Sequence, residues 1–337
     1  MDERLPWHAP LWRRLQRHRA DGRWPHALLL AGPSGLGKGS FARRLAASWC
    51  CARPEADGEA CGRCQGCRWF QAGSHPDFSA VRPAEDGKTI KVDQIRELAG
   101  FLGLSARCGG CKIALLEPAD RLNLNAANSL LKTLEEPPGD SRLLLVAAQP
   151  ARLPATVRSR CQTLKFAPPP AEDAIAWLSG RIAETDARSA LEVAGGAPLA
   201  ALALAEPQRW NRRRQLAENY DRILKGAADP VRAAEAWLQG DVAENLRWLA
   251  GWHADLIRLK MGVEPPRLSH PDLKPVLRRW AAPQSARALF ERLDAAVRLS
   301  ASSSTAQISL PLALEAFFCE SARVIVCDPS QRPVIEG

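Results

Sequence analysis

The sequence has no apolar run that approaches the roughly 18 residues needed to cross a lipid bilayer. Its first residues, MDERLPWHAPLWRRLQRHR, are charged and amphipathic and lack the apolar core of a secretory signal peptide. Internal repeats are absent, and the triple proline at 168–170 is the one low-complexity tract. These absences argue against membrane-spanning, secreted and repeat proteins, and we expect a cytoplasmic globular protein.

Lysine is scarce, so the net charge of +9 and the pI of about 9.3 come mainly from arginine. Apolar residues make up 46% and charged residues 25% of the chain, as in ordinary globular proteins. A length of 337 residues indicates two or three domains. The charge permits a nucleic-acid partner, but a solvated basic surface explains it equally well. Composition alone therefore identifies no partner.

The chain contains ten cysteines, which in a cytoplasmic protein indicate metal binding or free thiols rather than disulfides. Cys61, Cys64 and Cys67 form a C-x2-C-x2-C pattern, and Cys51 precedes them. Four thiolates at this spacing predict a tetrahedral zinc site, with an iron–sulfur cluster as the alternative. Four sulfur ligands leave no open coordination position, so the predicted metal is structural. Cys50 stays an alternative to Cys51 as the first ligand.

A glycine-rich loop, AGPSGLGKGS, follows an apolar run and precedes a helical pattern. Strand, loop and helix form the context in which backbone N–H groups and a helix N-terminus bind phosphates. The predicted phosphate-binding residues are Gly32, Gly35, Gly37 and Lys38. The next residue, Gly39, stands where a Ser or Thr hydroxyl should hold magnesium. Whether this loop binds a nucleotide, or only an anion, therefore stays open.

A second position that hydrolysis requires is also altered. The apolar run Lys112–Leu116 predicts the next core strand, and an acidic pair should follow it. One acid would hold the metal ion, and the other would polarise the attacking water. The sequence there is Glu117-Pro118, and proline has no group that can activate water. Together with Gly39, this change predicts a domain that does not hydrolyse nucleotides.

Apolar runs separated by amphipathic segments predict a parallel sheet covered by helices on both faces. The predicted strands are Ala27–Leu30, Phe78–Arg82, Lys112–Leu116 and Leu143–Ala147. The predicted helices among them include Lys91–Gly103 and Asn125–Glu136. Beyond the linker at 167–173 all patterns are helical, first at Ala174–Glu184, Asp186–Ala194 and Leu199–Leu204, and then to about Val326. The scattered tryptophans are expected to pack in the interior.

Two further motifs are LLKTLEEPP at Leu130–Pro138 and ATVRSRC at Ala155–Cys161. Placed after the glycine loop and the cysteine cluster, they resemble the bacterial DNA polymerase III clamp-loader subunits of the AAA+ family. The resemblance covers most of residues 1–205 and extends further through length and pattern only. It implies an α/β AAA+ module with a zinc-binding insert, a helical lid domain and an all-α collar domain for oligomerisation. We place these parts at 1–166 (zinc module at about 50–67), 167–205 and 206–337.

Because of these altered positions, the chain resembles a non-hydrolysing clamp-loader subunit. It is less similar to the gamma/tau subunit, which is an ATPase. Active relatives carry a sensing Thr or Asn where this chain has Ala148-Gln149, and a sensor arginine where it has Pro198-Leu199. The resemblance thus implies a stator subunit of the polymerase holoenzyme. Its implied partners are the delta and gamma/tau subunits, the sliding clamp and, through the complex, primed DNA.

The resemblance also assigns individual residues. Arg160 of the SRC motif is similar to the arginine finger that enters a neighbouring subunit's ATP site, where a rigid guanidinium can neutralise phosphoryl charge. The zinc ligands of the family correspond to Cys51, Cys61, Cys64 and Cys67, the same four cysteines that the spacing predicts. Arg212–Arg214 would either face DNA or form a solvated helix face. Two alternatives stay open: a gamma/tau-like ATPase, and a stand-alone zinc-bearing nucleic-acid-binding protein.

Overall fold

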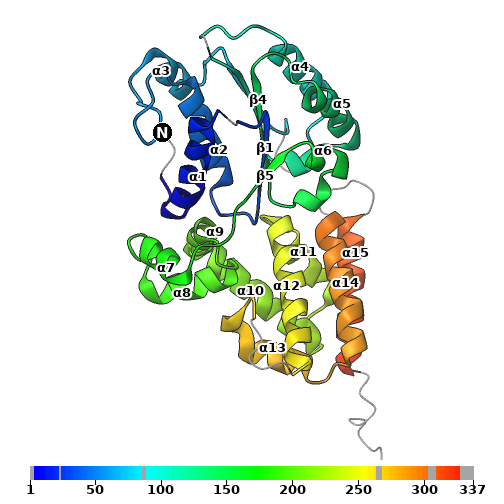
Figure 1. The fold of residues 1–337 in the computed structure, drawn as a ribbon. Helices are drawn as coiled ribbons and strands as arrows, with labels where there is room; N and C mark the ends of the chain where they lie inside the picture. Colours follow the sequence, from blue (N-terminus) through cyan, green and yellow to red (C-terminus); the bar gives the residue numbers. More distant parts are fainter. Residues whose placement is uncertain are drawn as a thin grey trace, which may run out of the picture. The chain divides into compact units, whose positions relative to one another are not determined.

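The computed structural model describes residues 4–22, 24–84, 89–108, 110–262, 268–302 and 309–326. The chain divides into two compact units, Met1–Asp173 and Ala174–Gly337 (Figure 1). Each unit has an apolar core of its own. Within the described ranges, no helix combines the length and the apolar character that a membrane span requires.

The first unit contains a parallel five-stranded sheet with the strand order β2-β3-β4-β1-β5. The strands are β1 (Ala27–Ala31), β2 (Phe78–Val81), β3 (Lys112–Leu116), β4 (Ser141–Ala147) and β5 (Gln162–Lys165). Every residue of β1 and β3 is buried, as expected for strands covered on both faces. The four predicted strands are confirmed. The sequence pattern does not reveal β5, because only Leu164 of this edge strand is buried.

Helices lie on both sides of this sheet, with α1 and α2 on one side and α4, α5 and α6 on the other (Figure 1). The helices are η1 (Pro6–His8), α1 (Ala9–Ala20), α2 (Lys38–Cys50), α3 (Gln65–Gln71), α4 (Val92–Leu102), η2 (Ala119–Arg121), α5 (Leu124–Glu135), η3 (Pro150–Arg152) and α6 (Ala155–Ser159). Ile95, Leu98 and Leu102 recur at helical spacing on α4, and all three are buried. The predicted helices at 91–103 and 125–136 are thereby confirmed within two residues at each end.

From α7 onward the described residues form helices and their connections, and α7 begins three residues before the boundary between the units. The helices are α7 (Ala171–Ser179), α8 (Glu184–Val193), α9 (Pro198–Leu204), α10 (Pro207–Leu224), α11 (Pro230–Trp237), α12 (Val242–Lys260), η4 (Pro271–Leu273), α13 (Lys274–Ala281), α14 (Ala286–Ser302) and α15 (Leu310–Val326). One small core joins α7, α8 and α9, and a larger core joins α10 to α15. The division into lid and collar domains at 205/206 stays a prediction.

Aromatic side chains fill the larger core. Trp237, Trp252 and Trp280 are buried, and their rings meet edge to face at centroid distances of 5.7 and 6.0 Å. Tyr220 lies among them, and its hydroxyl pairs with His253 Nε2 at 3.1 Å. Burial lowers the pKa of His253 to about 4, so the imidazole is neutral. The expectation that these tryptophans pack in the interior is confirmed.

The basic cluster on α10 corrects a sequence-based expectation. Arg213 is only 2% exposed, and its guanidinium binds Asp272 through two hydrogen bonds of 2.6 and 3.0 Å. Arg212 donates to two backbone carbonyls, and only Arg214 extends into solvent beside Glu218. The prediction of a solvated or DNA-facing cluster is wrong for Arg213, because η4 brings a carboxylate onto α10.

Candidate functional site

The glycine loop joins β1 to α2 in the predicted strand–loop–helix order. Gly35 and Gly37 have φ angles of +78° and +76°, in the left-handed region that only glycine adopts without strain. A Cβ atom at Gly32 would lie 2.2 Å from the carbonyl oxygen of Phe166, so this position also requires glycine. Gly37 is the N-cap of α2, and Lys38 is its first residue. The backbone of a phosphate-binding loop is therefore in place.

Residues that precede α1 pack against this loop. His8 is buried, and burial lowers its pKa to about 4, so the neutral ring donates from Nε2 to the carbonyl of Leu36 at 2.8 Å. Trp7 Nε1 donates to the same carbonyl at 3.0 Å. A Cβ atom at Gly37 would lie only 2.3 Å from Leu5 Cδ1. The chain's own N-terminal segment thus occupies one side of the loop.

Lys38 contacts the loop that carries it. Its Nζ donates to the carbonyl of Pro33 at 2.6 Å, and the residue is 6% exposed. Burial lowers the pKa of the amine, while the carboxylates of Asp120 and Glu117 oppose that change. In a nucleotide site this amine would reach the β- and γ-phosphates. Here one of the three N–H donors of the amine is bound to the Pro33 carbonyl of the same loop.

Glu117 lies beside Gly39 in an ion-pair cluster. Its Oε2 accepts hydrogen bonds from Arg43 Nη1 at 2.8 Å and from Arg82 Nη2 at 3.0 Å. A Cβ atom at Gly39 would lie 1.7 Å from Oε1 of the same carboxylate. The space for a metal-binding side chain at residue 39 is therefore taken by Glu117. Two guanidinium groups neutralise this carboxylate, as a bound cation otherwise would.

The position expected to sense the nucleotide is tied to the fold in a similar way. Asp120 Oδ2 accepts the backbone N–H groups of Ala148 at 3.1 Å and Gln149 at 2.7 Å. Sequence reasoning missed Asp120, Arg43 and Arg82, because each acts on residues at least 28 positions away in the chain. Pro198, the other altered position, begins α9 in the second unit.

Arg160 ends α6 and brings two sequence motifs together. Its Nη2 forms an ion pair with Glu135 Oε1 at 2.5 Å, and its Nη1 donates to the carbonyl of Thr156 at 3.0 Å. The side chain is 35% exposed. The structure thus joins the SRC motif to the LEEPP motif while leaving part of the Arg160 side chain accessible. Arg158 is exposed two residues earlier.

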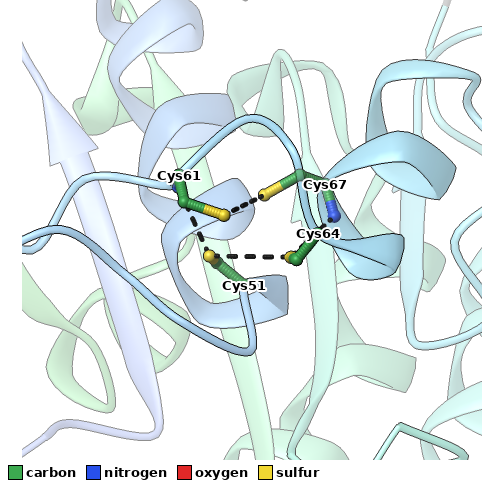
Figure 2. Close-up of side chains that lie close together, drawn as sticks. All are labelled: Cys51, Cys61, Cys64 and Cys67. Atoms are coloured by element: carbon green, nitrogen blue, oxygen red, sulfur yellow. Dashed lines mark hydrogen bonds between the residues drawn. The ribbon is translucent and has the colours of Figure 1, made fainter.

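Four cysteine sulfurs converge between α2 and α3 (Figure 2). Cys51 follows α2, Cys61 lies in the connecting loop, Cys64 caps α3 and Cys67 lies in its first turn. Their Sγ atoms all lie within 4.8 Å of one another, and no other cluster of this kind occurs in the described ranges. Cys50 does not belong to the cluster, and burial raises the pKa of its thiol. The four sulfurs form a site that could hold a metal ion.

Comparisons with known proteins identify the family. The family model for "DNA polymerase III, delta subunit" matches residues 7–170, and that for its C-terminal part matches 207–311. DNA polymerase III subunit delta′ of Pseudomonas aeruginosa is 38% identical over 282 residues, which cover 82% of this chain and 84% of that protein. The chain belongs to the DNA polymerase III delta′ family. The delta′ subunit of Escherichia coli is 38% identical over 259 residues, covering 76% and 77%.

A solved structure of a gamma subunit-related protein of DNA polymerase III from Thermotoga maritima is 16% identical to the chain. The superposition covers 93% of this chain and 99% of that protein, with a TM-score of 0.46. Within the delta′ family, the present chain combines a parallel sheet covered by helices with an all-helical C-terminal unit and a four-cysteine cluster. The expected family and fold class are confirmed.

Gly39→Ala tests whether Glu117 fills the space at residue 39. We expect a loss of about 1–3 kcal/mol in the free energy of unfolding, because the added methyl group meets a carboxylate held by two arginines. Urea unfolding measures the loss. Gly100→Ala in α4 is the matched control, since a Cβ there meets nothing within 4 Å. It should be neutral or stabilise the helix by up to about 1 kcal/mol.

The double variant Gly39→Ala/Glu117→Ala identifies the obstructing group. Its loss should be smaller than the sum of the two single losses, because removal of the carboxylate opens the space that the methyl group needs. Additive losses would show that Glu117 is not the group that excludes a side chain at residue 39.

Proposed function

We propose that this chain is the non-hydrolysing stator subunit of the replicative clamp loader, which places the sliding clamp on primed DNA. Membership of the delta′ family supports assembly with other clamp-loader subunits, namely delta and gamma/tau. The sliding clamp and DNA would be reached through the assembled complex. The observation that carries the non-hydrolysing role is the Glu117 carboxylate, bound by Arg43 and Arg82 directly over Gly39.

Nucleotide hydrolysis needs a metal ion on the phosphates and a group that polarises the attacking water. In this chain the Glu117 carboxylate beside Gly39 is already neutralised by Arg43 and Arg82, and Pro118 follows it. Lys38 is bound to the loop carbonyl of Pro33. These contacts support a domain that keeps the AAA+ fold for assembly and lacks turnover of its own.

The chain's contribution to catalysis would be Arg160, supplied in trans to the ATP site of a neighbouring gamma/tau subunit. The partly exposed Arg160 side chain supports this role, because a buried arginine could not meet a phosphate oxygen of another chain. An arginine is always charged and can stabilise charge that develops during phosphoryl transfer. A subunit that does not hydrolyse ATP can thus control hydrolysis next to it.

Zinc is the metal that we propose for the cysteine cluster. With zinc–sulfur distances of about 2.3 Å, sulfurs at the corners of a tetrahedron lie about 3.8 Å apart. The Cys51–Cys64 and Cys61–Cys67 Sγ separations are 3.8 and 4.0 Å. Bound zinc would cross-link the end of α2 to the start of α3. Four sulfur donors leave no position for a reacting water, so the metal's role would be structural.

Arg160→Ala tests the trans-acting role in a clamp loader reconstituted with delta and gamma/tau. We expect a large fall in clamp- and DNA-stimulated ATP hydrolysis, because arginine fingers contribute about 10³–10⁵ in rate at the site they serve. Gel filtration should show an intact complex. Arg158→Ala is the matched control, because Arg158 is an exposed arginine of the same motif. It should retain the wild-type rate, since no role in ATP hydrolysis is proposed for it.

An unchanged rate with Arg160→Ala would remove the finger assignment. The isolated chain should show no magnesium-dependent ATP turnover. Turnover by the isolated chain would instead establish the gamma/tau-like ATPase alternative.

Cys64→Ser tests the zinc site. The wild-type chain should contain zinc, and Cys64→Ser should lose it and melt at a lower temperature, because the cross-link between α2 and α3 is lost. Elemental analysis and thermal unfolding measure the two effects. Cys50→Ser is the control and should retain zinc, since Cys50 lies outside the cluster. Iron in the purified protein, or zinc retained by Cys64→Ser, would contradict the assignment.

A further inference from the structure

Glu135 is the last residue of α5, and its carboxylate reaches across to α6. Its Oε1 lies 2.5 Å from Arg160 Nη2. The other terminal nitrogen of the guanidinium, Nη1, donates to the carbonyl of Thr156 at 3.0 Å. Both terminal nitrogens of Arg160 are therefore anchored within the chain, one by a charge and one by the backbone. Among the described residues, no further hydrogen bond or ion pair of this guanidinium is found.

The pair adds little to the stability of the fold. The Glu135 side chain is 50% exposed and that of Arg160 is 35% exposed, and ion pairs in such surroundings contribute little. A carboxylate at the last residue of α5 also meets the negative end of the helix dipole. The ion pair is therefore better explained by its effect on Arg160 than by folding stability.

We propose that Glu135 is a positioning residue for Arg160, which it holds in the orientation that meets the phosphate of a neighbouring subunit. This inference rests on the proposed role of Arg160 in trans. An arginine side chain loses much rotamer freedom when it is fixed, and a finger already fixed loses less on binding. The Glu135 carboxylate and the Thr156 carbonyl together provide this fixation.

The two contacts leave the guanidinium able to bind a further anion. A guanidinium carries five N–H groups, so one hydrogen bond to Thr156 and one ion pair with Glu135 do not exhaust its donors. Glu135 contacts Arg160 at one terminal nitrogen, Nη2, and does not form a bidentate pair with the guanidinium. It therefore does not compete with a phosphate for the other donors. The carboxylate can therefore stay in place while phosphate oxygens bind the remaining donors.

The test uses the reconstituted clamp loader with Glu135→Ala, Glu135→Gln and Glu135→Lys. Loss of the anchor in Glu135→Ala should lower the stimulated kcat about three- to tenfold, the rate equivalent of ordering one long side chain. KM for ATP should change little, because the neighbouring subunit's own loop binds the nucleotide. Glu135→Gln retains an acceptor oxygen and should keep most of the rate. Glu136→Ala, at the next exposed position, is the matched control and should match wild type.

Glu135→Lys keeps the test valid if the alanine variant assembles poorly. A lysine at this exposed site should repel Arg160 and lower kcat at least as much as alanine does. If the carboxylate instead weakened phosphate binding through its charge, Glu135→Lys and Glu135→Gln would both raise the rate, and the proposal would be overturned. In the Arg160→Ala background, Glu135→Ala should add no further loss, because it acts through that arginine.

The variants also separate this inference from the proposed function. If Arg160→Ala lowers the rate and Glu135→Ala does not, the finger stands and the positioning role is wrong. If Arg160→Ala leaves the rate unchanged, both fail. An equal loss from Glu135→Ala with and without Arg160 would show a merely structural effect and would likewise overturn the positioning role.

Discussion

The ion-pair cluster around Glu117 is the constraint on which the rest of the nucleotide-binding region depends. Glu117 follows β3, Arg43 lies on α2, and Arg82 follows β2, so one carboxylate ties three elements together. A Cβ atom at residue 39 would meet this carboxylate, which would have to shift within its pairs with Arg43 and Arg82. The Glu117 carboxylate, which could otherwise bind a cation, is paired with the guanidinium groups of Arg43 and Arg82.

Other polar groups of the glycine loop are likewise bound by groups of the chain itself. Buried polar groups need partners, and a nucleotide would supply them in an active relative. Here Lys38 binds the carbonyl of Pro33, and His8 and Trp7 both bind the carbonyl of Leu36. The region is therefore held in one arrangement without a ligand. This arrangement suits a subunit that serves as a fixed reference for the moving parts of a complex.

Arg160 and the cysteine cluster lie outside this ion-pair cluster. Arg160 stays partly exposed at the end of α6, where Glu135 holds it, and it keeps donors for an external anion. The cysteine cluster lies between α2 and α3, in an insert with little apolar core of its own. The self-satisfied glycine loop and the partly exposed Arg160 are thus separate features of one α/β unit.

Local patterns in the sequence determined the strands, the glycine loop, the four-cysteine cluster and the family, because each depends on residue types at short, regular spacing. They did not reveal β5, whose residues are mostly exposed, or the burial of Arg213 against Asp272. Only the tertiary structure decided the partners of Glu117 and Arg160. Glu117 is 74 positions from Arg43, and Arg160 is paired with a residue on a different helix. Such pairs form because the sheet order brings distant elements together, and no periodic pattern records that order.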